Sequence, residues 1–516
     1  MLDRLFGFKV HQYLQALGLL IVAVGLPLNK VVMSIGTIWL ASNLVLDARF
    51  STYWSRWKES RLFWLVTALL LMHLIGLLYT ENFSYAFHDI NGKLPLFVIP
   101  VSIIAFPISR KSLHAVIGAF LVALLITSLI NWSMQTNAAD FRSLSLFGSH
   151  IRYTVLVAIG ISCCVQLTFY YKKLIFIAAP LALWFIYYVY VSQVFAGYLA
   201  LLIVIFSLIF HFIFQWKSRL LKYSLISVLL LSIGVIGYQG FRYLKTTPSV
   251  NFETLPSLTI NGNPYRHDST HQWYENGHHV LSMISEKELR PAWNRNSTYP
   301  YHGINDNGHK IKHTLFRYMA SKGLNKDSAG FSKMTDQDIR NVEKGFTNIR
   351  QLSGSPLARM ENFKNEYQQY TVDGNPNGNS FLQRLEHLRI GWKIAKDHWL
   401  IGVGTGDVQD SFDDYYERFN TQLSQKNWNR THNQLLTFWI TFGLSGLFIF
   451  SWLWLWLIAK SIQYSEFLAL SFSLIALGTF VSEDTIETQQ GVTFIAFFLA
   501  IVRLLFQYNE NQRKSP

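Results

Sequence analysis

The chain has 516 residues, of which 50% are hydrophobic and 16% aromatic, and its mean hydropathy is +0.20. This composition excludes an ordinary soluble globular protein and indicates a polytopic membrane protein. The net charge of +14 does not point to nucleic acid. Residues 242–431 hold 24 basic and 20 acidic side chains, a net +4, and the other +10 lies in the apolar parts, where a basic excess reflects topology.

Apolar runs of about 16 to 24 residues recur along the chain, and each is long enough for a helix to cross about 30 Å of hydrocarbon. Nine runs precede a polar stretch and three follow it: 10–28, 30–46, 62–79, 93–108, 112–132, 151–170, 174–192, 195–215, 219–241, then 432–458, 464–482 and 489–507. We therefore predict an all-α polytopic membrane protein with about twelve transmembrane helices. Its predicted parts are a membrane domain at 1–241, a large external region at 242–431 and a second membrane part with a short tail at 432–516.

The basic residues of the short connections indicate the orientation, because such residues stay on the cytoplasmic side. With the N-terminus inside, the cytoplasmic connections hold nearly all of them: Arg4, Lys9, Arg49, Arg56, Lys58, Arg61, Arg110, Lys111, Lys172, Lys173, Lys217, Arg219, Lys222, Lys460, Arg513 and Lys514. The opposite connections include an acidic turn at 81–89 and the acidic residues Glu483, Asp484 and Glu487, with four basic exceptions: Lys30, Lys93, Arg142 and Arg152. We expect both termini to be cytoplasmic and residues 242–431 to lie outside.

The external region divides by composition. Residues 245–302 are rich in Pro, Asn, Gly and Ser and predict loops with short ordered pieces. Helical spacing of apolar residues then predicts four helices, near 313–322, 335–346, 357–370 and 380–398. The region is thus expected to be mostly helical. The two cysteines, Cys163 and Cys164, lie in a predicted span, so no disulfide is expected to hold the external region.

His432 is the foremost candidate for chemistry, because it stands where the polar region re-enters an apolar helix. A side chain that exchanges a proton near neutral pH, held at the membrane surface, suits a substrate with a lipid tail and a polar head. Position alone also fits a plain helix cap formed with Asn433.

Four arginines are candidates for binding an anion, because the guanidinium fork matches phosphate oxygens. Arg384 and Arg389 lie on one predicted helix, five residues apart, and could face a polyanion together. Arg152 stands at the external end of a span against the charge bias, with His150 as a possible helper and Arg142 as a weaker candidate.

The glycine-rich segment 402–406, with Gly404 at its centre, is similar to a phosphate loop but lacks the preceding strand and the following lysine. A tight turn is the better interpretation. Two histidine pairs, His267 with His271 and His309 with His313, have a spacing that can ligate zinc on a helix, but a third ligand is not evident. We expect no metal ion, nucleotide or other cofactor.

Together these features resemble the O-antigen ligase family, within the wider group that includes O-antigen polymerases and O-linked oligosaccharyltransferases. The resemblance rests on the twelve-span architecture and on four local elements: Arg384-Leu385-Glu386 with Trp392, the turn 402–406, His432-Asn433-Gln434-Leu435, and the segment 442–447. The element Gly148-Ser149-His150-Ile151-Arg152 is similar to a variant of Bacteroidetes-type members. A departure is the Asn/His-rich stretch before residue 310, which is longer than in compact members.

The resemblance implies a glycosyltransferase of the bacterial inner membrane, with its large loop in the periplasm. Such enzymes transfer a glycan from undecaprenyl diphosphate to a hydroxyl, which in the ligases belongs to the lipid A core. His432 would be the general base, Arg384, Arg152 and Arg389 would hold the diphosphate, and Asn433, His150, Arg142 and Gly404 would support them. The expected partners are the carrier-linked glycan, the lipid A core or another glycan acceptor, and membrane lipids.

Three alternatives remain open. An O-antigen polymerase, or an O-linked protein oligosaccharyltransferase, would use the same donor site with a different acceptor. A non-enzymatic lipid or polysaccharide transporter would need charged side chains along a path through the membrane, and the predicted spans contain few.

Overall fold

A computed structural model describes residues 8–135, 145–192, 194–216, 218–245, 250–271, 273–353 and 379–514, together with 363, 364, 367, 370 and 374–377. The chain divides into two compact units. The first comprises residues 1–227, 387–421 and 428–516, and the second comprises residues 228–386 and 422–427. Part of the predicted external region, 387–421 and 428–431, therefore belongs to the first unit.

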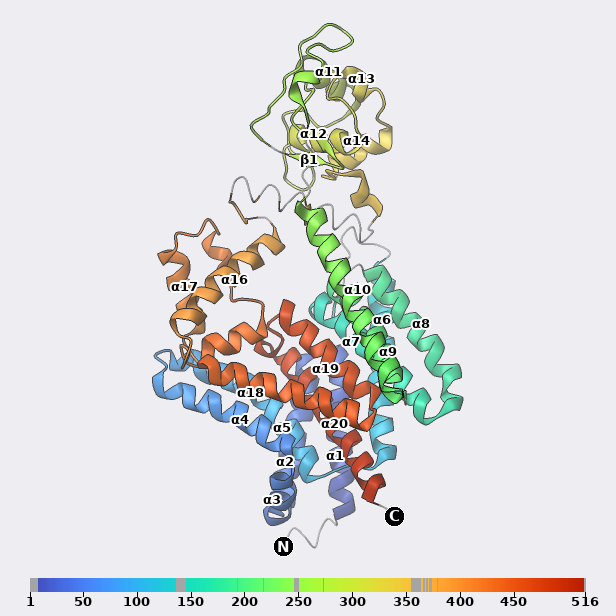
Figure 1. Ribbon diagram of the computed structural model, residues 1–516, viewed down its shortest axis with the longest axis vertical. Helices are drawn as coiled ribbons and strands as arrows, with labels where there is room; N and C mark the ends of the chain where they lie inside the picture. Colours follow the sequence, from blue (N-terminus) through green and yellow to red (C-terminus); the bar gives the residue numbers. More distant parts are fainter. Residues whose placement is uncertain are drawn as a thin grey trace. The chain divides into compact units, whose positions relative to one another are not determined.

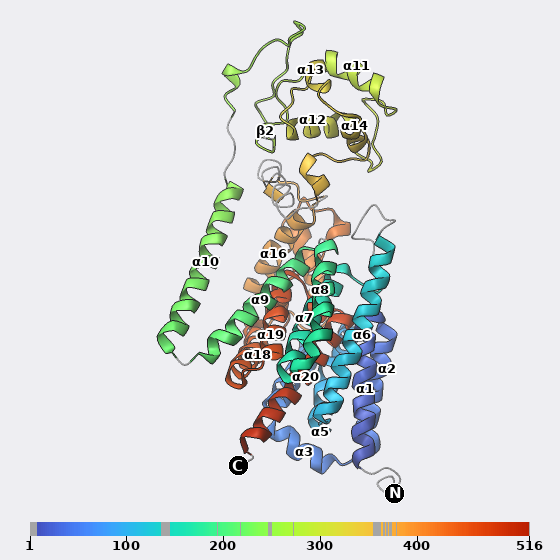
Figure 2. The same ribbon diagram turned by 90° about the vertical axis from the view of Figure 1, so that its right-hand side faces the viewer.

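The first unit is a bundle of helices. Its elements are α1 (Phe8–Leu28), α2 (Lys30–Asp47), α3 (Phe50–Glu59), α4 (Arg61–Gly76), η2 (Leu77–Tyr79), α5 (Phe83–Ala105), α6 (Arg110–Gln135), α7 (His150–Tyr170), η4 (Lys172–Leu174), α8 (Ile175–Ser192), α9 (Phe195–Gln215), α17 (Val408–Arg418), α18 (Gln434–Tyr464), α19 (Phe467–Ser482), η8 (Thr485–Glu487) and α20 (Gln489–Lys514). Two further helices, α10 (Arg219–Lys245) and α16 (Ser380–Asp397), belong partly to each unit. Figure 2 shows α1, α2, α5, α6, α7 and α20 running alongside one another, with α3 lying across the end of this group.

The structure confirms the all-α polytopic membrane architecture. Nine helices among the described residues are long and apolar enough to span a membrane, and each lies at a predicted span. Helices α5, α10 and α19 lie at the other three predicted positions, and α19 is a shorter apolar helix of 16 residues. Among these nine helices α20 is the most buried, since 83% of the residues in its most apolar stretch are buried. In contrast, α8 and α9 expose large apolar side chains such as Phe176 and Phe195, as expected of surfaces that face lipid.

Helix α5 begins earlier than its hydropathy predicts, and this difference matters for the site. The segment expected to be an acidic turn at 81–89 is helical from Phe83 onward. Asn82 caps the helix by accepting a hydrogen bond from the backbone N–H of Tyr85 at 3.0 Å. Asp89 and Lys93 therefore lie one turn apart on the same face of α5, where they form an ion pair.

The second unit has its own core outside the predicted spans. Its elements are η5 (Phe252–Thr254), β1 (Tyr274–Glu275), β2 (His278–His279), α11 (Glu286–Asn296), α12 (Ile311–Ser321), α13 (Ser328–Phe331), α14 (Asp336–Glu343) and η6 (Ile349–Ser353). The two short strands pair antiparallel. Figure 1 shows α11 to α14 gathered close to β1, and their buried side chains include Leu289, Trp293, Leu315 and Tyr318.

Three of the four predicted external helices are present, as α12, α14 and α16, and the fourth, 357–370, lies largely outside the described residues. Helix α14 begins with a capping box between Thr335 and Asp338. Helix α11 and the strand pair were not predicted, because they interrupt a stretch whose Asn, Pro and Gly content is typical of loops. The buried Glu288 on α11 organises that stretch by accepting hydrogen bonds from Thr259 and Asn263.

Candidate active site

His432 lies two residues before α18, in an unusual backbone conformation. Its φ is +51°, in the left-handed region that residues other than glycine rarely adopt. The next residue, Asn433, caps α18 by accepting a hydrogen bond from the backbone N–H of Leu436 at 2.9 Å. The tight connection fixes the direction in which the imidazole leaves the backbone. Strain of this kind is typical of functional sites.

Two acidic residues of the loop after α19 contact His432, one through its backbone and the other through its ring. The backbone N–H of His432 donates to Asp484 Oδ2 at 3.0 Å, and His432 Nδ1 lies 3.8 Å from Glu483 Oε2. The ring of His387, on α16, lies against the His432 ring with centroids 5.4 Å apart. About a third of the His432 side chain, 33%, stays exposed. The histidine is thus positioned by neighbours and still open to a substrate.

Asp484 is a buried carboxylate that links this turn to α18. It accepts a hydrogen bond from Thr437 at 2.8 Å in addition to the one from His432. Burial, with a further contribution from the nearby negative charge of Glu487, raises the pKa of Asp484 to about 6. Its role is therefore to hold the backbone of His432, since the carboxylate faces protein and not solvent.

A second group of charges surrounds Glu487, on η8. Its carboxylate lies 3.1 Å from Lys93 Nζ, 3.3 Å from Arg430 Nη1 and 3.0 Å from the amide nitrogen of Gln434. Lys93 also contacts Asp89 at 2.8 Å. Burial alone would raise the pKa of Glu487, but the two cations hold it well below its usual value, at about 2. The carboxylates of Asp89 and Glu487 thus balance the positive charges of Lys93 and Arg430, as burial of charged side chains requires.

Arg430 ties this group to α5. Its guanidinium carbon lies 4.8 Å above the ring of Tyr85, a cation–π arrangement, while Nη1 contacts Glu487. Its Nη2 atom is buried and makes no hydrogen bond to the described residues. Arg430 is two residues before His432 and therefore connects the His432 turn to the charges around Glu487.

The predicted arginines differ in their surroundings. Arg152 is half-buried near the start of α7, two residues after His150, and is attracted electrostatically to Glu483, the residue beside His432. Arg142 lies outside the described residues. The structure thus brings Arg152 and His432 to the same acidic residue, although more than half of the chain separates them in sequence.

Helix α16 carries the other two arginines on different faces. Five residues correspond to a rotation of about 140° on a regular helix, so Arg384 and Arg389 do not share one face as their spacing suggested. Arg384 is half-buried and stands one turn before His387, whereas Arg389 is exposed. Of the two, Arg384 is on the side of α16 that includes the histidine against His432.

The glycine-rich segment is a structural turn. The backbone N–H groups of Val403 and Gly404 donate to the carbonyls of Ile440 and Thr441 on α18, at 2.8 and 3.0 Å. Gly404 is buried with φ +98°, and a Cβ there would lie 3.2 Å from the carbonyl oxygen of Gly76. The N–H groups of Gly402, Val403 and Gly404 thus donate to backbone carbonyls, and that of Gly406 donates to the Thr80 hydroxyl at 2.8 Å, so these groups do not form a phosphate cradle. The turn joins α16 to α18 and α4.

The sequence interpretation missed the acidic residues that contact His432 and the charged residues grouped around Glu487. Asp89, Lys93, Arg430, Glu483, Asp484 and Glu487 were assigned to external connections, where single charges are usually solvated. One signal was present: Lys93 is an exception to the charge bias, and its burial with Glu487 explains why. The acidic spacing of Glu483, Asp484 and Glu487 was a second signal. Hydropathy could not show that three separate segments would meet.

The histidine pairs do not form a metal centre among the described residues, which contain no cluster of three or more His, Cys, Asp or Glu side chains that could hold a metal ion. His267 instead accepts from the backbone N–H of Met283 at 3.1 Å. His309 precedes the first residue of α12, so the helical spacing assumed for His309 and His313 does not apply.

Residues 347–451 match the family model described as O-Antigen ligase. The matched segment contains α16, the glycine turn, α17, His432 and the first part of α18, whereas Arg152 and the loop after α19 lie outside it. The match supports membership of the chain in the O-antigen ligase family, and with it an enzyme of the glycosyltransferase type in a multi-pass membrane protein. No curated protein matches the chain.

Proposed function

We propose that this protein transfers a glycan from undecaprenyl diphosphate to a hydroxyl of the lipid A core, at the periplasmic face of the bacterial inner membrane. The observation that carries the proposal is His432: it lies in the segment matched to the O-antigen ligase family, in a strained turn, between Glu483 and His387.

In the proposed reaction, His432 accepts the proton of the acceptor hydroxyl as its oxygen attacks the anomeric carbon. A new bond forms between that oxygen and the anomeric carbon, and the bond from this carbon to the diphosphate oxygen breaks. Undecaprenyl diphosphate leaves with the electron pair. Glu483 would stabilise the protonated His432 in this step, because its carboxylate oxygen lies 3.8 Å from Nδ1 of the imidazole.

Arginines would neutralise the charge that grows on the leaving diphosphate. Arg152 and Arg384 are proposed as the main contacts, Arg389 as a weaker one, and Arg142 and His150 as supporting residues. Asn433 and Gly404 would support the site by holding the start of α18 and the turn against α4. The energy for transfer comes from the diphosphate linkage of the donor, so no nucleotide and no metal ion is required.

Transfer by the purified full chain, given carrier-linked glycan and lipid A core, tests the proposal. His432→Ala should abolish transfer while leaving the amount of folded protein unchanged, and the wild type should work in excess chelator. His398→Ala is a matched control, since this exposed histidine lies in the same matched segment. Near-normal turnover of His432→Ala would contradict the assignment. Transfer only to a second carrier-linked glycan would instead identify a polymerase.

A further inference from the structure

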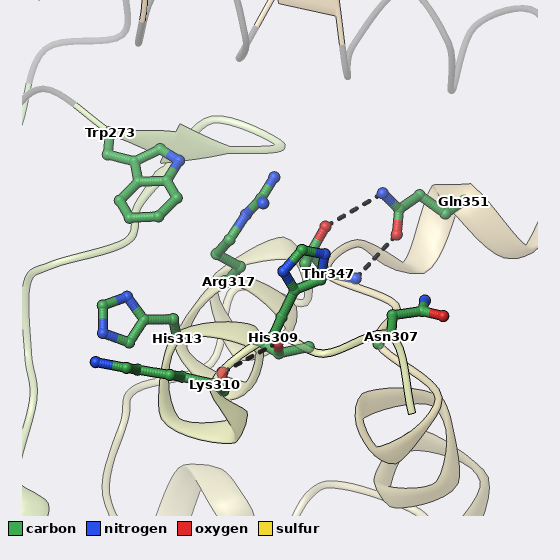
Figure 3. A pocket seen from close by; sticks show the side chains of 10 residues that line it. Trp273, Asn307, His309, Lys310, His313, Arg317, Thr347 and Gln351 are labelled. Carbon is green, nitrogen blue, oxygen red and sulfur yellow. Dashed lines mark hydrogen bonds between the residues drawn. The ribbon is translucent and has the colours of Figure 1, made fainter. Parts of the chain in front are cut away.

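A polar pocket opens on the surface of the second unit, near the start of α12. Its volume is about 390 Å³, within the range of small-molecule sites. It is lined by Trp273, Asn307, His309, Lys310, His313, Thr314, Arg317, Gly345, Thr347 and Gln351. Figure 3 shows Trp273 on one side and Gln351 on the other, with Arg317 and His309 between them and with His313 and Lys310 below Trp273.

The pocket is electropositive. Four of its lining residues are Lys, Arg or His, and none of the ten is acidic. Arg317 is held in place by Glu275, whose buried carboxylate accepts from Arg317 Nε at 2.7 Å. Burial and then the charges of Lys312 and Lys310 lower the pKa of His313, although Glu286 opposes them. An anion entering here would therefore meet Lys310 and Arg317 in particular.

The remaining lining groups fit a sugar. Trp273 is half-buried, and the guanidinium carbon of Arg317 lies 5.4 Å from the centroid of its ring, so the indole and the cation can together meet the C–H face and the carboxylate of one acidic sugar. Gln351 and Thr347 hold each other in place, since the Gln351 amide donates to the Thr347 hydroxyl at 3.1 Å. Asn307, at the rim, adds an amide that can pair with hydroxyl groups.

We infer that this pocket binds an acidic saccharide, with a sugar ring on Trp273 and separate carboxylates directed toward Arg317 and Lys310, whose charged ends lie on different sides of the pocket. A phosphate ion would use the cations but not the indole, and a neutral sugar would use the indole but not the cations. The site goes beyond the proposed transfer reaction, because its residues take no part in bond making or breaking.

Calorimetric titration of the full chain in detergent tests the inference, with α-1,4-digalacturonate as the probe. Its neutral counterpart, α-1,4-galactobiose, differs only in having hydroxymethyl groups in place of carboxylates. We expect saturable binding of digalacturonate, at least tenfold weaker binding of galactobiose, and no displacement of digalacturonate by an equal concentration of inorganic phosphate. Equal binding of the two sugars, displacement by phosphate, or the absence of saturable binding would overturn the inference.

Two variants separate the contributions of charge and ring. Lys310→Met and Trp273→Leu should each weaken digalacturonate binding at least tenfold. Lys310 is exposed, so its variant tests the site even if the loss of Trp273 disturbs the core beneath it. Lys287→Met, an equal loss of charge at another exposed position, is the control. Unchanged binding by Lys310→Met would overturn the inference. His432→Ala should bind digalacturonate normally, so a failure of the transfer proposal would be distinguishable.

Discussion

Glu483 Oε2 lies 3.8 Å from His432 Nδ1. In the sequence, His432 comes just before α18 and Glu483 just after α19, so these two consecutive helices bring them together. The contact places a negative charge behind the ring nitrogen that would not face the acceptor. Such a partner orients an imidazole and favours its protonated form. Glu483 is thus a positioning residue for the proposed base.

Replacing Glu483 by Gln should lower kcat roughly tenfold to a hundredfold, because it removes the charge while keeping the shape, in the manner of other groups that orient a histidine. The acid limb of the kcat profile should move to lower pH, since the protonated histidine loses a stabilising neighbour. The fall in kcat should exceed the change in the KM for the donor, which reflects only the lost attraction between Glu483 and Arg152. A lower kcat with an unmoved acid limb would show that Glu483 acts only structurally.

Lysine should not replace Arg152 or Arg384 in binding the diphosphate, because lysine lacks the paired donors of the guanidinium group. Losing one charge-assisted contact costs about 1.5–3 kcal/mol. Arg152→Lys and Arg384→Lys should therefore each weaken donor use by one to two decades in kcat/KM, and Arg389→Lys by less. Arg295→Lys, at an exposed position on α11, is the control. Full activity of both Arg152→Lys and Arg384→Lys would contradict bidentate binding of the diphosphate by these arginines.

The charges around Glu487 should contribute to stability as well as to position. Glu487→Gln leaves Lys93 and Arg430 buried with one carboxylate fewer. Breaking a buried ion pair costs about 3–5 kcal/mol, so the variant should unfold at a clearly lower temperature in detergent. Glu81→Gln, the same substitution at an exposed position, should leave the melting temperature unchanged. Equal melting temperatures for the two variants would contradict the buried-network account.

Hydropathy predicted the membrane helices well because lipid-facing and core positions are both apolar. The start of α5 was missed for the opposite reason. Asp89 and Lys93 are polar in sequence, yet pairing with each other and with Glu487 allows them to be buried in a helix. Pairing between distant segments leaves no periodic signal in a single sequence.

The candidate site was predicted in part. His432 could be singled out because the change from polar to apolar sequence is local. Its neighbours Glu483, Asp484 and His387 could not, since each comes from another segment and only packing brings them together. In the second unit, α11 was not predicted because the surrounding sequence has the composition of a loop. Hydrogen bonds from Thr259 and Asn263 to Glu288 nevertheless order this segment.

Gly443 is predicted to be irreplaceable, because it combines a positive φ inside a helix with a close contact to another segment of backbone. It kinks α18 with φ +64°, and a Cβ there would lie 2.1 Å from the carbonyl oxygen of Leu400. Gly443→Ala should therefore yield little folded protein by size-exclusion chromatography. Gly118→Ala, on α6, meets no atom within 4 Å and should fold as well as the wild type. Normal yields of both variants would show that the turn against α18 can relax.

Lys326 should make the second unit more stable as the pH rises above 7. Its Nζ atom is buried and donates to the carbonyls of His279 and Ser282, at 2.9 and 3.1 Å. Burial lowers the pKa of Lys326 to about 7, from an ordinary value of 10.5. Between these two values the unfolded chain binds a proton that the folded chain lacks, so the free energy of unfolding increases with pH.

Hydrogen exchange of the α12 amides, corrected for intrinsic rates, measures this dependence between pH 7 and pH 9. Protection in the wild type should increase over that range. Lys326→Met should show a flatter dependence, because the titrating group is gone, while the exposed Lys333→Met should behave as the wild type does. If Lys326→Met kept the full increase, another group would have to be responsible and the burial argument for Lys326 would fail.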